Sequence, residues 1–198
     1  MSLVVVPTGT ANIASVLAGL RRLGADPSLA SSVDDVDGAD RVVIPGVGSF
    51  GAAMETLDRA GLREAVRERI NAGRSTLAVC VGMQLLAPVS EETDGAPGLG
   101  LVGEAVKRFP ETVRVPQLGW NEVTADPSSR FLTDGWAYFA NSYRFESVAP
   151  GWTAAFSDHG GEFVAAMERG EVLACQFHPE LSGEWGSLVL AKWLGRAA

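Results

Sequence analysis

The stretch TLAVCVGMQLL, residues 76–86, decides the fold expected for this chain. Its opening run, 76–80, is mostly apolar and has the length of a strand buried on both faces of a parallel sheet. A second apolar run, 81–87, follows at once and predicts a helix. Cys80 therefore stands where a buried strand turns sharply into a helix.

The residues before this stretch repeat the same alternation. Apolar runs at 2–7 and 41–45 predict buried strands. Helical periodicity predicts helices over 12–24 and 52–73, the second broken near Gly61. Continuous apolar strands that alternate with amphipathic helices indicate an α/β fold, with a mostly parallel central sheet and helices on both faces.

The second half of the chain changes character. Segments 136–148, 152–158 and 162–177 look like hairpin-connected strands, with a turn at 169–171, and a last helix is expected over 184–197. This half predicts an antiparallel addition to the parallel sheet. The loop at 90–100 is expected to be a lid or a connector, since nothing there marks a domain boundary.

Length and composition narrow the class of protein. With 198 residues the chain suits one domain, 1–198. Cys80 and Cys175 are too few for a disulfide scaffold and have no metal-binding spacing, so we expect a reduced, cytoplasmic setting and no metal. The net charge is −8 without a basic cluster, which argues against nucleic acid, and no apolar run is long enough for a membrane span.

Cys80 is the candidate nucleophile. A residue on a tight turn between a strand and a helix exposes its side chain, and the helix N-terminus beneath it favours a thiolate. The backbone N–H of Val81 can face a developing oxyanion. The alternative is a buried, inert cysteine, which is common in proteins.

The candidate base is His178, in the motif CQFHPE. It follows a predicted strand, and Glu180 lies two residues further on, where its carboxylate can orient the imidazole. Without a nucleophile, the pair would be interpreted as a solvated loop. His159 is interpreted as a turn residue without a catalytic role.

The glycine-rich segment IPGVGSFG, residues 44–51, follows the predicted strand at 41–45. Its glycines permit close backbone approach to a ligand and make it a candidate source of a second oxyanion donor. Glycine-rich turns are frequent after strands. The significance of this one is that three strand ends would meet at the same edge of the sheet.

Five short motifs give the chain a resemblance to a known family. They are CVGMQ at 80–84, PGVGSFG at 45–51, VPQLGWN at 115–121, NSY at 141–143 and QFHPE at 176–180. Together they resemble the class I glutamine amidotransferases, and among these the glutaminase subunits of imidazole glycerol phosphate synthases. The resemblance extends over the whole chain.

The resemblance implies a flavodoxin-like fold and an enzyme that hydrolyses L-glutamine to glutamate and ammonia through a glutamyl thioester, without a cofactor. It implies that Cys80 is the nucleophile, His178 the acid–base and Glu180 its orienting partner. The oxyanion hole would consist of the N–H groups of Val47 and Val81. The residues implied to bind the substrate are Gly46, Gly48, Gln84, Asn141, Ser142 and Tyr143.

The resemblance also implies a partner. The ammonia would pass to a cyclase subunit with a (β/α)8 barrel, in a cytoplasmic heterodimer that serves histidine biosynthesis. Asn12, Trp120 and Asn121 would face this cyclase. Trp120 lies beside a glycine in a stretch expected to be a polar loop, where a tryptophan can anchor an interface. Alternatively, it packs under that loop.

Two further interpretations stay open. One is a glutaminase of another class I enzyme, such as the subunit that feeds pyridoxal phosphate synthase. The other is a non-catalytic module that uses the same fold as a scaffold. The presence of Cys80, His178 and Glu180 argues against the second.

Overall fold

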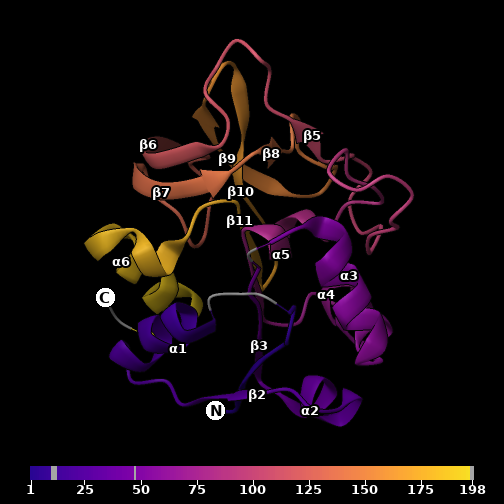
Figure 1. Ribbon diagram of the computed structural model, residues 1–198. Coiled ribbons are helices and arrows are strands. Elements are labelled where there is room, and N and C mark those ends of the chain that lie inside the picture. Colours follow the sequence, from indigo (N-terminus) through magenta and orange to yellow (C-terminus); the bar gives the residue numbers. More distant parts are fainter. Residues whose placement is uncertain (10–12, 47, 197–198) are drawn as a thin grey trace.

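The computed structural model describes residues 1–9, 13–46 and 48–196. Within these ranges, nine strands form one sheet in the order β2-β1-β3-β4-β11-β10-β9-β6-β7 (Figure 1). The strands from β2 to β11 in this order are parallel, and those from β11 to β7 are antiparallel. Strand β11 therefore joins a parallel half to an antiparallel half.

The parallel half contains the most deeply buried strands. Its members are β1 (Leu3–Val5), β2 (Pro27–Leu29), β3 (Arg41–Ile44), β4 (Thr76–Val79) and β11 (Val172–Cys175). Strands β4 and β11 are buried at every position, as continuous apolar runs predict for a sheet covered on both faces. They pair directly, with Val79 opposite Cys175.

The antiparallel half is made of longer strands. They are β6 (Gln117–Ala125), β7 (Gly135–Asn141), β9 (Thr153–Asp158) and β10 (Glu162–Arg169). Two short strands, β5 (Lys107–Arg108) and β8 (Tyr143–Arg144), form a separate pair. A turn at Gly170, which has the left-handed φ of 61°, connects β10 to β11 as predicted.

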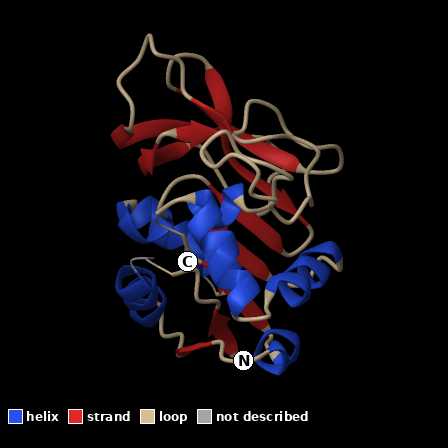
Figure 2. Cartoon of the chain, turned by 45° about the vertical axis from the view of Figure 1, so that its right-hand side comes forward, coloured by secondary structure: helices blue, strands red, loops and turns tan. Residues whose placement is uncertain are grey.

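Helices lie on both sides of the parallel strands (Figures 1 and 2). Helices α1 (Ile13–Arg22) and α6 (Gly183–Trp193) lie on one side, and α3 (Phe50–Arg59) and α4 (Arg63–Asn71) on the other. The remaining helical elements are α2 (Val33–Gly38), α5 (Val81–Gln84) and the 3-10 turn η1 (Pro179–Leu181). In the part of the chain described, no helix combines the length and apolar character that a membrane crossing requires.

The fold predicted from the sequence is confirmed, with three corrections. The stretch 115–121 is not a polar loop, because β6 begins at Gln117 and pairs with β7 and β9. The edge strand β2 and the short helix α2 were not predicted. The α-helix after Cys80 spans only Val81–Gln84, shorter than the predicted 81–87.

Candidate active site

Cys80 occupies a strained turn between β4 and α5. Its φ of 54° and ψ of −112° make it the one non-glycine residue with positive φ in the described ranges. Such a backbone costs free energy and persists only where the surroundings enforce it. Here the N–H of Cys80 donates to the carbonyl oxygen of Cys175 at 2.7 Å. The predicted nucleophile therefore sits on a sharp elbow that its neighbouring strand holds in place.

Gly82 is required for this elbow to lie against the next strand. A Cβ added at Gly82 would lie 2.1 Å from the carbonyl oxygen of Ile44, at the end of β3. No larger residue fits there without moving the backbone. The glycine two residues after Cys80 is thus explained by close packing between two strand ends.

His178 and Glu180 form the predicted pair. Nδ1 of His178 donates to Oε1 of Glu180 at 2.9 Å, and the two side chains are only 7% and 4% exposed. The N–H of His178 donates to the carbonyl oxygen of Tyr138 at 2.9 Å, which fixes the backbone of the base. Since Nδ1 is engaged with the carboxylate, Nε2 is the ring nitrogen available to Cys80.

The electrostatics of His178 favour its charged form. Burial acts to lower the pKa of His178, but hydrogen bonds to Cys80 and Glu180 and their negative charges raise it from 6.5 to about 10. The site therefore favours the imidazolium form of His178 beside the cysteine. This is the proton donor that a departing amine requires.

Cys80 and His178 open into a cavity of about 260 Å³. Its lining residues are Gly48, Cys80, Val81, Gln84, Glu92, Ala140, Asn141, Ser142, Tyr143 and His178. The structure thus brings together the predicted nucleophile, the predicted base and most of the residues expected to bind the substrate. Three separate segments of sequence, around 80, 141 and 178, meet here because their strands share one sheet.

The predicted oxyanion residues have a specific arrangement. The N–H of Val81 donates to the carbonyl oxygen of Gly46 at 3.4 Å. Gly46 is buried and so close to the elbow that an added Cβ would lie 2.5 Å from the nitrogen of Gly82. Gly46 therefore contacts the elbow without lining the cavity. Val47, expected to supply the other donor, lies outside the described residues.

Two predicted substrate residues interact with each other near the cavity. Asn141 is buried, and its Nδ2 donates to the carbonyl oxygen of Tyr143 at 3.0 Å. The Oδ1 atom of Asn141 is buried without a hydrogen-bond partner. A buried acceptor without a partner is costly, so a ligand that donates to it would be favoured.

Sequence reasoning missed Glu92, which also lines the cavity. Its Oε2 accepts a hydrogen bond from the N–H of Phe50 at 2.6 Å, at the start of α3. The loop at 90–100, interpreted only as a lid or connector, thus brings a carboxylate to the site. The signal in the sequence was a group of three acidic residues, Glu91, Glu92 and Asp94, in the loop.

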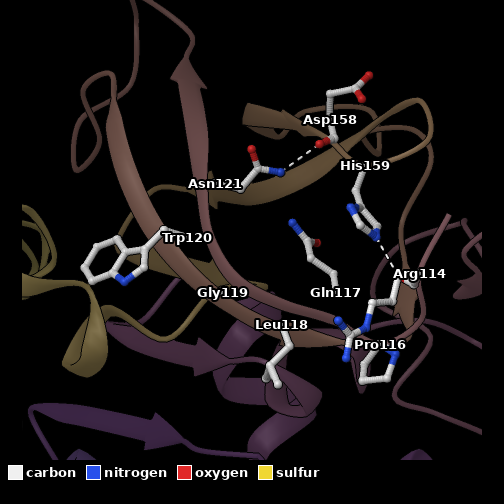
Figure 3. A pocket seen from close by; sticks show the side chains of 9 residues that line it. All are labelled: Arg114, Pro116, Gln117, Leu118, Gly119, Trp120, Asn121, Asp158 and His159. Atoms are coloured by element: carbon white, nitrogen blue, oxygen red, sulfur yellow. Dashed lines mark hydrogen bonds between the residues drawn. The ribbon is translucent and has the colours of Figure 1, made fainter.

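The residues predicted to face a partner lie apart from Cys80. Trp120 and Asn121 are in β6 and line a second cavity, of about 430 Å³. Figure 3 shows Asn121 and His159 pointing toward this cavity while the Trp120 ring points away from it. Trp120 is 55% exposed and meets Tyr138 edge to face at 6.2 Å. Asn12, the third of these residues, lies outside the described residues.

His159 is in the turn that was predicted for it. Its Nε2 lies 2.8 Å from the carbonyl oxygen of Arg114, and its ring packs edge-on against Phe109. It lines the cavity shown in Figure 3, and it is not among the residues that line the Cys80 cavity. The structure gives it no place beside the nucleophile.

The chain is similar in sequence to several known proteins over nearly its whole length. Imidazole glycerol phosphate synthase subunit HisH of Symbiobacterium thermophilum is 40% identical, over 96% of this chain and 92% of that protein. The HisH subunit of Halobacterium salinarum is also 40% identical, over 100% and 94%. A chloroplastic Arabidopsis thaliana protein, imidazole glycerol phosphate synthase hisHF, is 38% identical over 94% of this chain, which matches 33% of its own length.

Solved structures agree on the fold. A glutamine amidotransferase crystal structure superimposes with a TM-score of 0.76 at 22% identity, covering 96% of this chain and 98% of that one. PurLQS from Thermotoga maritima gives 0.77 at 18% identity, covering 98% and 97%. The family model described as glutamine amidotransferase class-I matches residues 9–194. The chain therefore belongs to the class I glutamine amidotransferase family.

Proposed function

We propose that this chain is the glutaminase subunit of an imidazole glycerol phosphate synthase, and that it hydrolyses L-glutamine to glutamate and ammonia at Cys80. The observation that carries the proposal is the elbow itself. A cysteine with a φ of 54° opens into a cavity beside an imidazole that is hydrogen-bonded to a buried carboxylate. Full-length relatives with the same subunit name support the choice within the family.

The three side chains of the site account for each step of the proposed reaction. The Cys80 thiolate attacks the side-chain carboxamide carbon of glutamine, and the electron pair of the C=O bond moves to oxygen. Collapse of this intermediate breaks the C–N bond, and the His178 imidazolium gives its proton to the leaving nitrogen, which departs as ammonia. Water then attacks the thioester with His178 as base, releasing glutamate and the thiolate. Glu180 orients the ring throughout.

The cavity offers complementary groups for the rest of the substrate. Glutamine carries an α-ammonium group, and the Glu92 carboxylate is the acidic side chain that lines the cavity. Gln84, Asn141 and the backbone of Ser142 and Tyr143 supply amide and carbonyl groups around it. The Oδ1 atom of Asn141, which lacks a partner, is a candidate acceptor for a substrate N–H.

The ammonia is proposed to pass to a cyclase with a (β/α)8 barrel. The Arabidopsis relative named hisHF supports a partner but not its fold, because about two thirds of its length lies outside the match to this chain. The exposed face of β6, with Leu118 at 67% and Trp120 at 55% exposure, is the proposed docking surface. Leu118 and Trp120 are two residues apart on one strand and therefore project from the same face, and apolar side chains exposed side by side in this way are typical of interfaces.

A single substitution tests the proposal. Cys80→Ala, assayed with the cyclase, is expected to abolish glutamine-dependent product formation and to leave synthesis from ammonium salts intact. The second assay controls for folding and for docking of the partner. Glutamine turnover by Cys80→Ala would overturn the assignment of the nucleophile. Glutamine hydrolysis by the wild type without any stimulation or product from a cyclase would point to another class I enzyme, and no hydrolysis at all would point to a scaffold.

A further inference from the structure

Gln176 is a buried polar side chain beside the nucleophile. It immediately follows β11 and is completely buried, with 0% exposure. Its Nε2 lies 3.7 Å from Sγ of Cys80, within hydrogen-bonding distance for sulfur. Its Oε1 lies 2.9 Å from Nε2 of Gln84. A buried amide with both ends engaged is held in one orientation.

The orientation of the amide is fixed by a backbone group. Nε2 of Gln84 donates to the carbonyl oxygen of Tyr143 at 3.2 Å, and a backbone carbonyl can only accept. The Gln84 nitrogen that makes this bond also faces Gln176, so Gln176 must present its oxygen there. Its N–H group is therefore the end that faces the sulfur. A flipped amide would place two donors against each other.

The strand explains why Gln176 and His178 both reach Cys80. The N–H of Gln176 donates to the carbonyl oxygen of Ala165 at 2.8 Å, and the N–H of His178 to that of Tyr138 at 2.9 Å, so both backbones are pinned. In an extended segment, residues two apart point to the same side. The residue between them, Phe177, packs into the core against Phe139. The nucleophile is thus approached by two side chains of one segment.

We propose that Gln176 is a catalytic hydrogen-bond donor to the Cys80 thiolate. It stabilises the anion and, through its hydrogen bond with Gln84, connects the thiolate to a residue that is proposed to hold glutamine. This inference deepens the proposed function and rests on it. A hydrogen bond from a neutral amide to a thiolate is worth more than one to a thiol, so it favours the charged nucleophile.

The test measures the reactivity of Cys80 in the absence of substrate and partner. Cys80 is alkylated with iodoacetamide across a pH series, and the modified peptide is identified by mass spectrometry. Cys175 does not interfere, because it is fully buried and burial raises the pKa of its thiol well above the usual value. The measured quantity is the pH midpoint at which Cys80 becomes reactive.

Gln176→Met keeps the size of the side chain and removes the donor. We expect its midpoint to rise by about one pH unit, which corresponds to about a tenfold loss of thiolate below the midpoint. Gln176→Glu is expected to raise the midpoint further, because it keeps an acceptor for Gln84 and places a carboxylate beside the sulfur. Thermal melting of both variants shows whether the fold is kept.

Gln84→Met is the comparison variant, since it removes the amide that orients Gln176 but keeps the Gln176 donor itself. It is expected to raise KM for glutamine and to raise the Cys80 midpoint by less than Gln176→Met does. An unchanged midpoint in both Gln176 variants, or an equal rise in Gln84→Met, would overturn the inference. Alkylation needs neither glutamine nor cyclase, so its result is separate from that of the Cys80→Ala assay.

Discussion

The backbone N–H of Val81 is already bonded, at 3.4 Å, to the carbonyl oxygen of Gly46. Val81 directly follows the nucleophile, so its N–H is the group expected to receive the oxyanion. The carbonyl oxygen of Gly46 therefore accepts the hydrogen bond that the oxyanion would have to accept. The nucleophile, base and carboxylate are assembled, but the oxyanion donor is not open.

We therefore expect the chain on its own to hydrolyse glutamine slowly. Loss of one oxyanion donor typically costs about 10²–10³ in kcat. Binding of the cyclase is expected to raise kcat by displacing the Gly46 carbonyl. Glutamate release is measured with and without the partner, and alkylation of Cys80, which needs no oxyanion hole, serves as the control. Equal kcat in both states would contradict this prediction.

The raised pKa of His178 predicts a spectroscopic result. Cys80→Ala removes one of the groups that raise it, so the pKa of His178 should fall from about 10 toward its usual value of 6.5. Ring-proton NMR can follow this, because the chain has only two histidines and His159 serves as an internal reference. A His178 titration that is the same in both proteins would contradict the proposed thiolate–imidazolium pair.

The raised pKa of His178 also makes the free energy of unfolding depend on pH. The folded pKa of His178 lies above the unfolded value, so its contribution to the free energy of unfolding is fully present below about pH 6.5. It is lost as the pH rises through about 10. Denaturant unfolding across this window should show a decline that is smaller in Cys80→Ala.

Gly19, in the middle of α1, is predicted to position the triad carboxylate. A Cβ added there would lie 2.9 Å from Cβ of Glu180, so Gly19→Ala should push Glu180 away from His178. We expect kcat to fall several-fold while the melting temperature changes little, because alanine favours the helix by about 1 kcal/mol. Gly38→Ala in α2 is the control, since nothing lies within 4 Å of its added Cβ. Equal kcat in the two variants would refute the positioning role.

Trp120 is predicted to anchor the cyclase. Trp120→Ala should weaken binding by about 2 kcal/mol or more, roughly 30-fold in Kd, without unfolding the chain. Leu29→Ala is a suitable control because Leu29 is 54% exposed in the edge strand β2, at the other end of the sheet. Titration calorimetry measures both affinities. If both variants bind like the wild type, β6 does not provide the anchor.

The parallel half of the fold could be predicted because its strands are buried on both faces and therefore read as continuous apolar runs. Strand β2 could not be predicted because it is three residues long, begins with a proline and exposes Ser28 and Leu29. Helix α2 could not be predicted because Val36 is its single buried residue, so it has no apolar periodicity. The start of strand β6 was predicted to be a loop because its apolar residues, Leu118 and Trp120, are exposed and flank a glycine, and pairing with β7 and β9 defines the strand.

The candidate site, like the fold, could be predicted only in part. Cys80, His178 and Glu180 could be predicted because each follows a recognisable strand, and parallel strands place their ends at one edge of a sheet. Glu92 could not, since an acidic residue in a loop is normally solvated and only the path of the chain brings it to the cavity. The role inferred for Gln176 likewise depends on Gln84 and Tyr143, which are distant from it in sequence.

The pairing of β4 with β11 also determines when the protein can act during its own synthesis. Cys80 is translated early, whereas His178 and Glu180 follow the last strand of the described sheet. A nascent chain that has exposed the cysteine has as yet no imidazole to protonate the leaving nitrogen. Unfinished copies on the ribosome should therefore leave cellular glutamine intact, and ammonia production begins only after β11 has emerged and joined the sheet.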